Sequence, residues 1–473
     1  MTISRRTFVA APAAFALGGR GFAAPSDRIR AACVGVGAQG LRVMMDFLKE
    51  PDLQVVAVCD VNKGSSDYSE WGHYELRDKV RKLLGEPDWG GNAAEYTGAT
   101  AGLEPARYVV DTYYAKRSRC AVYNDFRELL AKEKGIDAVI IGTPDHLHAP
   151  VAIAAMRAGK HVFCQKPMAH SILEARKMAE VARQTGVATQ VAIVNQASEA
   201  TRRLCEWVWD GAIGPVREVH NWSSRPFWPQ GMERPPEVQP APAGLDWDLW
   251  LGPAPTRPYN KAYQPFVWRG WTDFGCGALG DMACYSFDTI FRVLKLGPPE
   301  RVEGRSSELF QESFPKASII HFTFPARGEM PPVRLTWYDG GLRPPRPEGL
   351  APGDKFDEEG LLFVGDNGSI LCEFEGGNPR ILPESRMRAY VQPPQTLPRS
   401  PGNNREWIDA AKGGKPGGAN FEFEALVTES LLVGNVALRT REKLDWDGKN
   451  LRFTNVAAAN DLVHRPYREG WTL

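Results

Sequence analysis

The sequence predicts an α/β protein in two parts: an N-terminal doubly wound parallel sheet, then a C-terminal α+β domain with an open, mostly antiparallel sheet. Up to residue 196, short apolar runs alternate with helix-length segments, which is typical of a parallel sheet. The first apolar run ends in a glycine-rich turn, and from residue 197 alternating strand patterns dominate. A chain of 473 residues is too long for one ordinary core, so two domains are expected.

The glycine-rich turn predicts a dinucleotide site. Residues 31–40 read AACVGVGAQG, an apolar strand that ends in G-x-G-x-x-G, and residues 41–48 follow as a helix. The first glycine permits a tight turn, the second admits a pyrophosphate, and the third lets the helix pack on the strand. The helix N-terminus attracts phosphates. The predicted loop comprises Gly35, Val36, Gly37, Ala38, Gln39 and Gly40.

An acid follows at the position that this motif requires. The apolar run 55–59 ends in Asp60, 20 residues after Gly40, where a carboxylate binds the adenosine ribose. A carboxylate there favours NAD as the cofactor, whereas Lys63 and two adjacent serines leave NADP open. The pattern predicts a Rossmann domain over residues 27–196; the structural alternative is a glycine-rich turn at a strand end.

The remaining elements follow in order. Residues 61–121 are an irregular insertion with helices at 75–84 and 105–116, expected over the adenine side or at a subunit contact. Helices are then predicted at 126–134, 150–158, 172–185, 200–210, 279–295 and 423–439. Strands are predicted at 137–141, 160–164, 187–194, 216–222, 301–308, 319–324, 333–338, 361–365 and 369–374. Residues 197–473 are expected to bind substrate and to form a homo-oligomer through their sheet.

The N-terminus predicts export. Residues 4–9 read SRRTFV, a twin-arginine motif, and an apolar run to Leu17 follows that is too short to span a bilayer. We therefore expect residues 1–24 to be a signal segment and the mature protein to be periplasmic. The alternative is a disordered start on a cytoplasmic enzyme. Because proteins exported this way commonly load their cofactor before crossing, a tightly bound cofactor is expected.

The composition limits the classes of partner and cofactor that the sequence suggests. A formal net charge of zero gives no indication of nucleic acid or an anionic membrane as partner. Eight cysteines lack any C-x-x-C pair, so most are expected to be core residues, with one disulfide left open. The histidines show no metal-binding spacing, and no metal is predicted.

Two stretches suggest catalysis. Lys166 follows a predicted strand, and Pro167 fixes the turn so that the ammonium points over the crevice, where it would stabilise a developing alkoxide. Asp281, Tyr285 and Asp288 share one face of a predicted helix. Beside Lys166, the ionised form of the Tyr285 phenol would be favoured. The alternatives to a catalytic role are that the lysine lies on the surface, the aspartate caps the helix and the tyrosine packs in the core.

Together these motifs resemble the Gfo/Idh/MocA oxidoreductase family, through GVGAQG, Thr143-Pro144 with His148, Gln165-Lys166-Pro167 and residues 277–288. The resemblance implies an NAD(P)-dependent enzyme that acts on a ring secondary alcohol of a sugar, glycoside or cyclitol. It implies catalysis by Lys166, Asp281 and Tyr285, although Gln165 replaces the usual Glu and Tyr285 the usual His. The twin-arginine motif, WTDFG and GALGD resemble the exported branch of the family.

Further site residues are expected around these groups. Thr143, Pro144, His148, Gln165 and also Lys166 are expected to bind the cofactor, and Asn195, Arg269 and Trp271 to line the substrate pocket. Two other functions stay open: an NAD-dependent glycoside hydrolase with no net redox change, and a non-catalytic nucleotide-binding protein. Release of an aglycone without net reduction of the nicotinamide would indicate the hydrolase.

Overall fold

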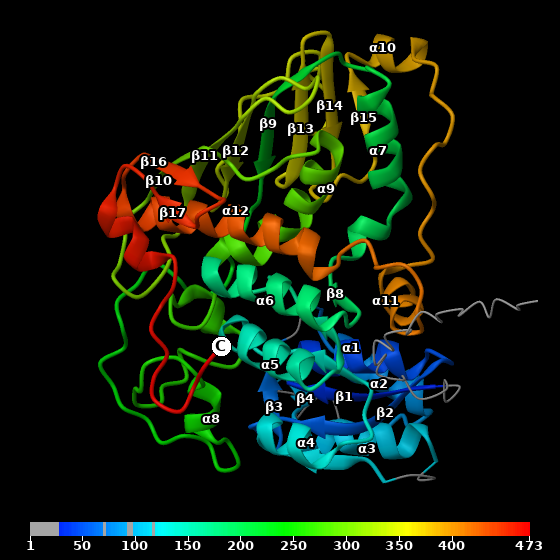
Figure 1. Ribbon diagram of the computed structural model, residues 1–473, viewed down its shortest axis with the longest axis vertical. Coiled ribbons are helices and arrows are strands. Elements are labelled where there is room, and N and C mark those ends of the chain that lie inside the picture. Colours follow the sequence, from blue (N-terminus) through cyan, green and yellow to red (C-terminus); the bar gives the residue numbers. More distant parts are fainter. Residues whose placement is uncertain (1–27, 70–71, 92–97, 116–118) are drawn as a thin grey trace, which may run out of the picture.

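The computed structural model describes residues 28–69, 72–91, 98–115 and 119–473. The predicted signal segment, residues 1–24, lies outside the described residues. Two sheets lie in separate layers of the molecule, with helices between them (Figure 1). Among the described residues, no helix combines the length and the apolar character needed to cross a bilayer.

The first sheet is the predicted Rossmann sheet, and its parallel order is confirmed. Its six strands run in the order β5-β2-β1-β6-β7-β8, and every neighbouring pair is parallel. The strands are β1 Ile29–Val34, β2 Leu53–Cys59, β5 Ala121–Tyr123, β6 Ala138–Ile141, β7 His161–Cys164 and β8 Thr189–Val191. The helices are α1 Ala38–Leu48, α4 Phe126–Lys132, α5 Asp145–Arg157 and α6 Ile172–Thr185.

One helix begins earlier than the sequence predicts. Proline is common in the first helical turn, which favours a start at residue 150. The structure instead starts α5 at Asp145, directly after Pro144, and runs the helix through Pro150. The earlier start places Asp145 at the carboxyl end of β6, beside the glycine-rich turn.

The insertion forms a small layer beside the sheet. Its strands β3 Ser65–Tyr68 and β4 Ala99–Ala101 pair antiparallel, and its helices are α2 Glu75–Leu84 and α3 Leu103–Tyr113. Tyr68 packs so close to the glycine-rich turn that a Cβ on Gly37 would lie 2.9 Å from its ring. The insertion therefore contributes to the nucleotide side of the molecule.

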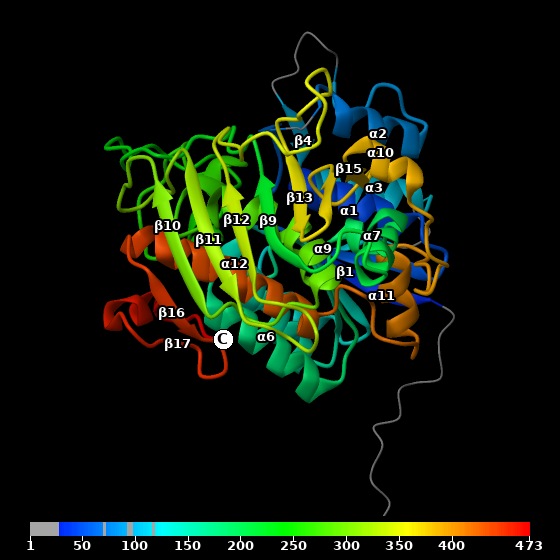
Figure 2. The same ribbon diagram turned by 90° about the horizontal axis from the view of Figure 1, so that it is seen from above.

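The second sheet is mixed and mostly antiparallel, as predicted. Its nine strands run in the order β15-β14-β13-β9-β12-β11-β10-β16-β17, and only β9 and β12 pair in parallel (Figure 2). The strands are β9 Val216–Trp222, β10 Arg301–Ser306, β11 Ser318–Phe324, β12 Val333–Tyr338, β13 Gly360–Gly365, β14 Gly368–Cys372, β15 Arg380–Leu382, β16 Leu444–Asp447 and β17 Arg452–Phe453.

Helices join the two layers. The long helix α12, Phe421–Thr440, packs on β10 and β11 on one side and on α6 on the other, and it is buried nearly all round (Figure 1). The other helices of this part are α7 Glu199–Trp209, α8 Trp247–Leu251, α9 Cys284–Leu294, α10 Glu384–Ala389 and α11 Asn403–Ala411.

Helix α11 returns to the first sheet. Its Trp407 is fully buried, with ring centroids 5.4 Å from Phe47 of α1 and 5.5 Å from Phe163 of β7. Trp407 and Ile408 thus belong to the apolar core beneath the Rossmann sheet, although the predicted boundary between the domains lies at residue 196. Burial of these side chains stabilises the contact between the two parts of the chain.

The cysteines are core residues. All eight lie within the described residues, where each is buried and carries a free thiol. The disulfide that the sequence left open is not formed.

Candidate active site

A cleft of about 380 Å³ lies between the two sheets, at the carboxyl ends of the parallel strands. This is where doubly wound sheets bind their ligands. The predicted site residues that line the cleft are Gly35, Gly37, Ala38, Gln39, Asp60, Thr143, Pro144, Gln165, Lys166, Arg269, Asp281 and Tyr285. Val36, Gly40, His148, Asn195 and Trp271 do not line it.

The glycine-rich turn is held by contacts that exclude any side chain. Gly35 has a φ of +79°, and a Cβ there would lie 2.5 Å from the backbone nitrogen of Thr143. A Cβ on Gly40 would lie 1.9 Å from the carbonyl oxygen of Gly35. Gly40 thus serves the close approach of helix to strand rather than the lining of the cleft.

Asp60 fastens this turn from the neighbouring strand. Its Oδ2 accepts a hydrogen bond from the backbone N–H of Val36 at 2.7 Å, and its Oδ1 accepts one from Asn62 at 2.8 Å. Burial raises the pKa of Asp60 to about 6, against the lowering effect of these backbone hydrogen bonds. The carboxylate lines the cleft and has lone pairs left for a ribose hydroxyl.

The turn fits a dinucleotide. Gly37 precedes helix α1 and provides no side-chain cap, so the positive end of the helix faces the cleft uncovered. Thr143 lines the same space, and its Oγ1 is buried without a hydrogen-bond partner among the described residues. These groups would hold a pyrophosphate, and Asp60 would hold the adenosine ribose.

A lysine from the first sheet meets the second domain inside the cleft. Lys166 Nζ donates to the backbone oxygen of Asp281 at 2.7 Å and to its Oδ1 at 3.0 Å, and it lies 4.8 Å from the centre of the Tyr285 ring. Burial disfavours the charged form of Lys166, but Asp281 and Tyr285 outweigh it and raise the lysine pKa above its usual value. The ammonium therefore stays protonated.

Asp281 joins two cations. Its Oδ1 also accepts a hydrogen bond from Arg269 Nε at 2.9 Å, and its Oδ2 is buried with no partner among the described residues. Burial alone would raise the pKa of Asp281, yet Lys166 and Arg269 hold it below its usual value. Arg269 is fixed between aromatic rings, with Cζ 4.5 Å from the centre of Phe266 and 4.3 Å from that of Trp268.

Tyr285 differs from the sequence-based expectation. A neighbouring lysine favours the ionised phenol, but burial has the larger effect and raises the pKa of Tyr285 to about 12. The prediction of a readily ionised tyrosine is therefore wrong. At neutral pH the side chain is a protonated phenol, which can still donate a hydrogen bond.

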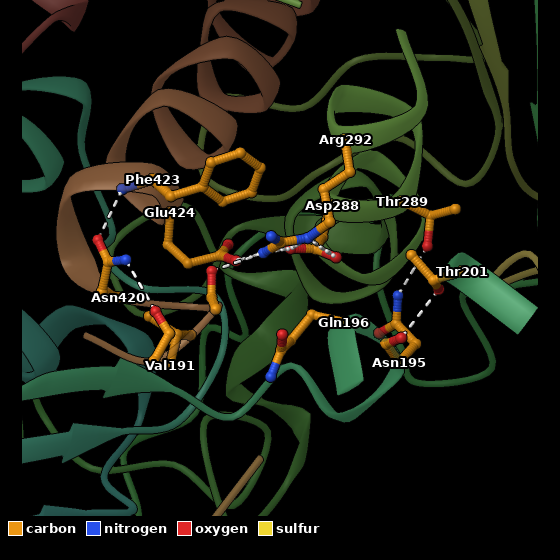
Figure 3. A network of polar contacts seen from close by, with 12 residues as sticks. Val191, Asn195, Gln196, Thr201, Asp288, Thr289, Arg292, Asn420, Phe423 and Glu424 are labelled. Atoms are coloured by element: carbon orange, nitrogen blue, oxygen red, sulfur yellow. Dashed lines mark hydrogen bonds and ion pairs between the residues drawn. The ribbon is translucent and has the colours of Figure 1, made fainter. Parts of the chain in front are cut away.

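Asp288 does not line the cleft with Asp281 and Tyr285. Asp281 lies in a π-helical turn, Leu279–Ala283, so the spacing of a regular α-helix does not hold between Asp281 and the residues of α9. Asp288 instead receives Arg292 at 2.6 Å in a buried cluster that includes Glu424 of α12 (Figure 3). Its position corrects the predicted three-residue face.

Asn195 acts behind the site. Its Nδ2 donates to the backbone oxygen of Tyr285 at 2.9 Å and to Thr289 Oγ1 at 3.0 Å, while Thr201 Oγ1 donates to its backbone oxygen (Figure 3). Asn195 was predicted to contact cofactor or substrate. In the structure its side chain instead holds helix α9 against the end of the Rossmann sheet.

His148 and Trp271 are likewise buried away from the cleft. The ring nitrogens of His148 lie 2.7 Å from the Pro167 oxygen and 2.9 Å from the Thr143 oxygen, so the ring links two strand-end loops instead of lying beside the nicotinamide ribose. Burial lowers the pKa of His148 to about 4. Trp271 is 1% exposed in an aromatic cluster with Tyr263 and Phe274.

The sequence analysis missed Asp145. This residue lines the cleft, is 2% exposed, and lies in the field of Arg269, Asp281 and Lys166. Burial raises its pKa to about 7, although the two cations lower it. The sequence did contain a signal for Asp145, because this residue directly follows Thr143-Pro144 near the end of a strand. The prediction of a helix start at residue 150 placed Asp145 in a loop and so hid this signal.

Comparison with known proteins agrees with this arrangement. The profile of the Gfo/Idh/MocA oxidoreductase family with an NAD-binding Rossmann fold matches residues 93–193, and the profile of its C-terminal α/β domain matches residues 214–304. Each of the two parts of the chain thus matches a domain of the Gfo/Idh/MocA oxidoreductase family. The two matched regions fall in the two parts whose sheets enclose the cleft.

Individual members of the Gfo/Idh/MocA family are distant. Levoglucosan dehydrogenase of Pseudarthrobacter phenanthrenivorans is 32% identical over 22% of this chain, and a glycosyl hydrolase family 109 protein of Stenotrophomonas maltophilia is 31% identical over 34%. The matches span only 28% and 29% of these relatives' own length. The WlbA dehydrogenase of Chromobacterium violaceum, solved with NADH and UDP-GlcNAcA, shares the fold at 16% identity, with a TM-score of 0.56 over 89% of this chain and 96% of that one.

Proposed function

We propose that this protein is an NAD(P)-dependent oxidoreductase that transfers a hydride between the nicotinamide and a ring secondary alcohol or ketone of a sugar, glycoside or cyclitol. The observation that supports it most is the meeting of Lys166, Asp281 and Tyr285 in the cleft that also contains the glycine-rich turn. Asp60 favours NAD because its buried carboxylate would repel a 2′-phosphate.

The residues divide the chemistry between them. A bound nicotinamide supplies or takes the hydride. Lys166, kept protonated by Asp281, stabilises the negative charge that develops on the alcohol oxygen. The unpartnered Oδ2 of Asp281 accepts a hydrogen bond from a substrate hydroxyl, and the Tyr285 phenol donates one.

The proton needs a group that changes charge near neutral pH. The pKa values of Lys166 and Tyr285 lie too high for this, and that of Asp281 lies too low. Asp145 lies in the same cluster with a pKa of about 7. We therefore assign to the Asp145 carboxylate the role of final proton acceptor during oxidation.

A substrate screen tests the proposed activity. Purified protein is incubated with NAD and a panel of sugars, cyclitols and glycosides, and products are analysed by mass spectrometry. The expected result is a product that has lost two hydrogens, with one nicotinamide reduced for each.

The similarity to a glycosyl hydrolase family 109 protein supports a second candidate, an NAD-dependent glycoside hydrolase. Release of aglycone without net nicotinamide reduction would favour that hydrolase and contradict the dehydrogenase.

We also propose export through the twin-arginine segment with the cofactor already bound. A periplasm offers no large pool of nicotinamide nucleotide, so a cofactor held tightly and recycled in place suits the compartment. Protein recovered from a periplasmic fraction and dialysed is expected to release about one nucleotide per chain on denaturation, measured by mass spectrometry. The Gly40→Ala variant, whose Cβ would meet Gly35, is the control expected to release none. Cytoplasmic retention or nucleotide-free wild-type protein would contradict this proposal.

A further inference from the structure

A second cavity, of about 110 Å³, lies beside residues 272–281, which contain Asp281 and are called the catalytic segment below. It is bounded by the start of α6, the C-terminal half of α12, the turn at residues 272–276 and residues 461–465. It is far smaller than the roughly 300–1,000 Å³ of sites for drug-sized ligands. A single small molecule or ion is the largest occupant that it admits.

Polar atoms without partners gather around this cavity. Asn435 is 8% exposed; its Nδ2 donates to the Cys276 oxygen at 2.9 Å, which leaves its Oδ1 buried without a partner among the described residues. Within the same part of the chain, the Nε and Nη2 of Arg465 and the Nδ1 atoms of His170 and His464 are likewise buried and have no hydrogen-bond partner. Because buried polar atoms are normally hydrogen-bonded, such a cluster around one cavity indicates a polar occupant.

The charge around the cavity is positive. Arg439 and Arg465 both line it, and neither forms an ion pair within the described part of the chain. The carboxylate of Asp273 is paired with Arg257, and Asp461 is exposed, so water screens its charge. Burial lowers the pKa of His170 and of His464, so the positive charge comes from the arginines alone.

We propose that this cavity binds a small tetrahedral oxyanion that keeps a hydroxyl proton, as hydrogen phosphate does. Arg465 donates from Nε and Nη2 to two of its oxygens, the forked geometry in which guanidinium groups bind oxyanions. The Asn435 Oδ1 accepts from the hydroxyl, which a fully deprotonated anion does not offer. The site is separate from the main cleft and does not depend on the proposed enzymatic activity.

The cavity is linked to the catalytic segment. Asn435 holds the backbone of Cys276, and Arg465 Nη1 donates to the Asp273 oxygen at 2.5 Å. Both backbone groups belong to the chain that leads into the π-helical turn with Asp281. An oxyanion here therefore fixes the two side chains that hold this segment, and its binding raises the stability of the folded protein.

Calorimetry and thermal unfolding of the full chain test the site. Inorganic phosphate is titrated against chloride at constant ionic strength, with methyl phosphate as a monoester in a parallel series. Phosphate is expected to bind and to raise the melting temperature. Arg465→Gln is expected to weaken binding about tenfold or more because it removes charge-assisted hydrogen bonds, and Arg439→Gln is expected to weaken binding because it removes the second positive charge that lines the cavity. The matched control is Arg441→Gln, an exposed arginine outside the cavity, which is expected to keep wild-type binding.

The outcomes separate the alternatives. Binding of inorganic phosphate, with loss in the two cavity variants, supports the site, and the methyl phosphate series then shows whether the site also accepts a monoester. Binding of methyl phosphate alone would contradict the proposed contact of the Asn435 Oδ1 with a phosphate hydroxyl. Phosphate bound at the glycine-rich turn instead would leave both cavity variants with the wild-type response, which overturns the proposal, as does the absence of phosphate binding. Because Arg439 is exposed, its variant remains informative even if Arg465→Gln fails to fold.

Discussion

Replacing Lys166 with Met is expected to lower kcat by about 10³-fold while leaving nucleotide affinity nearly unchanged. Methionine fills the space of the lysine stem but removes the ammonium, which lies 3.0 Å from Asp281 Oδ1 and to which we assign the stabilisation of the developing alkoxide. The change should not unfold the protein, since Arg269 remains as a partner of the buried Asp281 carboxylate. Steady-state oxidation of the substrate found by the screen and titration of NADH fluorescence measure the two quantities.

Lys160→Met is the matched control. Lys160 precedes strand β7, whereas Lys166 follows it, and its Nζ donates to the Ile136 oxygen at 2.7 Å outside the cleft. This variant is expected to keep wild-type kcat. A Lys166→Met enzyme that loses nucleotide binding in proportion to turnover would contradict a role confined to the chemical step.

Replacing Asp145 with Asn is expected to lower the oxidation rate about 100-fold at pH 8 and to remove its dependence on pH near 7. The pKa of Asp145 is raised to about 7, so the carboxyl is protonated below that pH and cannot accept a proton. The wild-type oxidation rate therefore rises with pH through about 7, as the carboxylate forms. Asparagine has no such transition, and kcat measured from pH 5 to pH 9 is expected to be flat in that region.

Asp339→Asn controls for other buried acids. Burial also raises the pKa of Asp339 to about 7, but this residue lies outside the cleft, where it accepts hydrogen bonds from Ser318 and Trp337. Its variant is expected to keep the wild-type pH profile. A pH profile that moved in Asp339→Asn and stayed unchanged in Asp145→Asn would contradict the assignment of this titration to Asp145.

Sequence patterns predicted the features of the fold and site that depend on the order of neighbouring residues. The glycine spacing, the alternation of strands and helices, and the position of Lys166 after a strand led to both sheets and to the side of the sheet on which the cleft lies. Strand ends of a parallel sheet meet at one edge, which is why residues far apart in the sequence could be placed together.

The incorrect predictions concern properties that depend on the three-dimensional fold and cannot be derived from the order of neighbouring residues. The pKa of Tyr285 depends on the balance between burial and Lys166, and burial is a property of the whole fold. Helical periodicity assumes a regular α-helix, which fails across the π-helical turn that contains Asp281, and it gives no sign that Asp288 pairs with Arg292 instead of lining the cleft. His148 and Asn195 follow strands as site residues do, but their side chains bind backbone oxygens behind the cleft.

Helix α11 constrains how such proteins can be recombined. Because Trp407 packs against both Phe47 and Phe163, a Rossmann fragment cut at residue 196 would expose two phenylalanine rings to water. A chimera that grafts a foreign substrate domain onto this nucleotide half would have to retain residues 403–411 or supply an equivalent tryptophan. Exchange of modules within this architecture therefore requires compatible partners on both sides of the graft, and not merely a cut in the connecting segment.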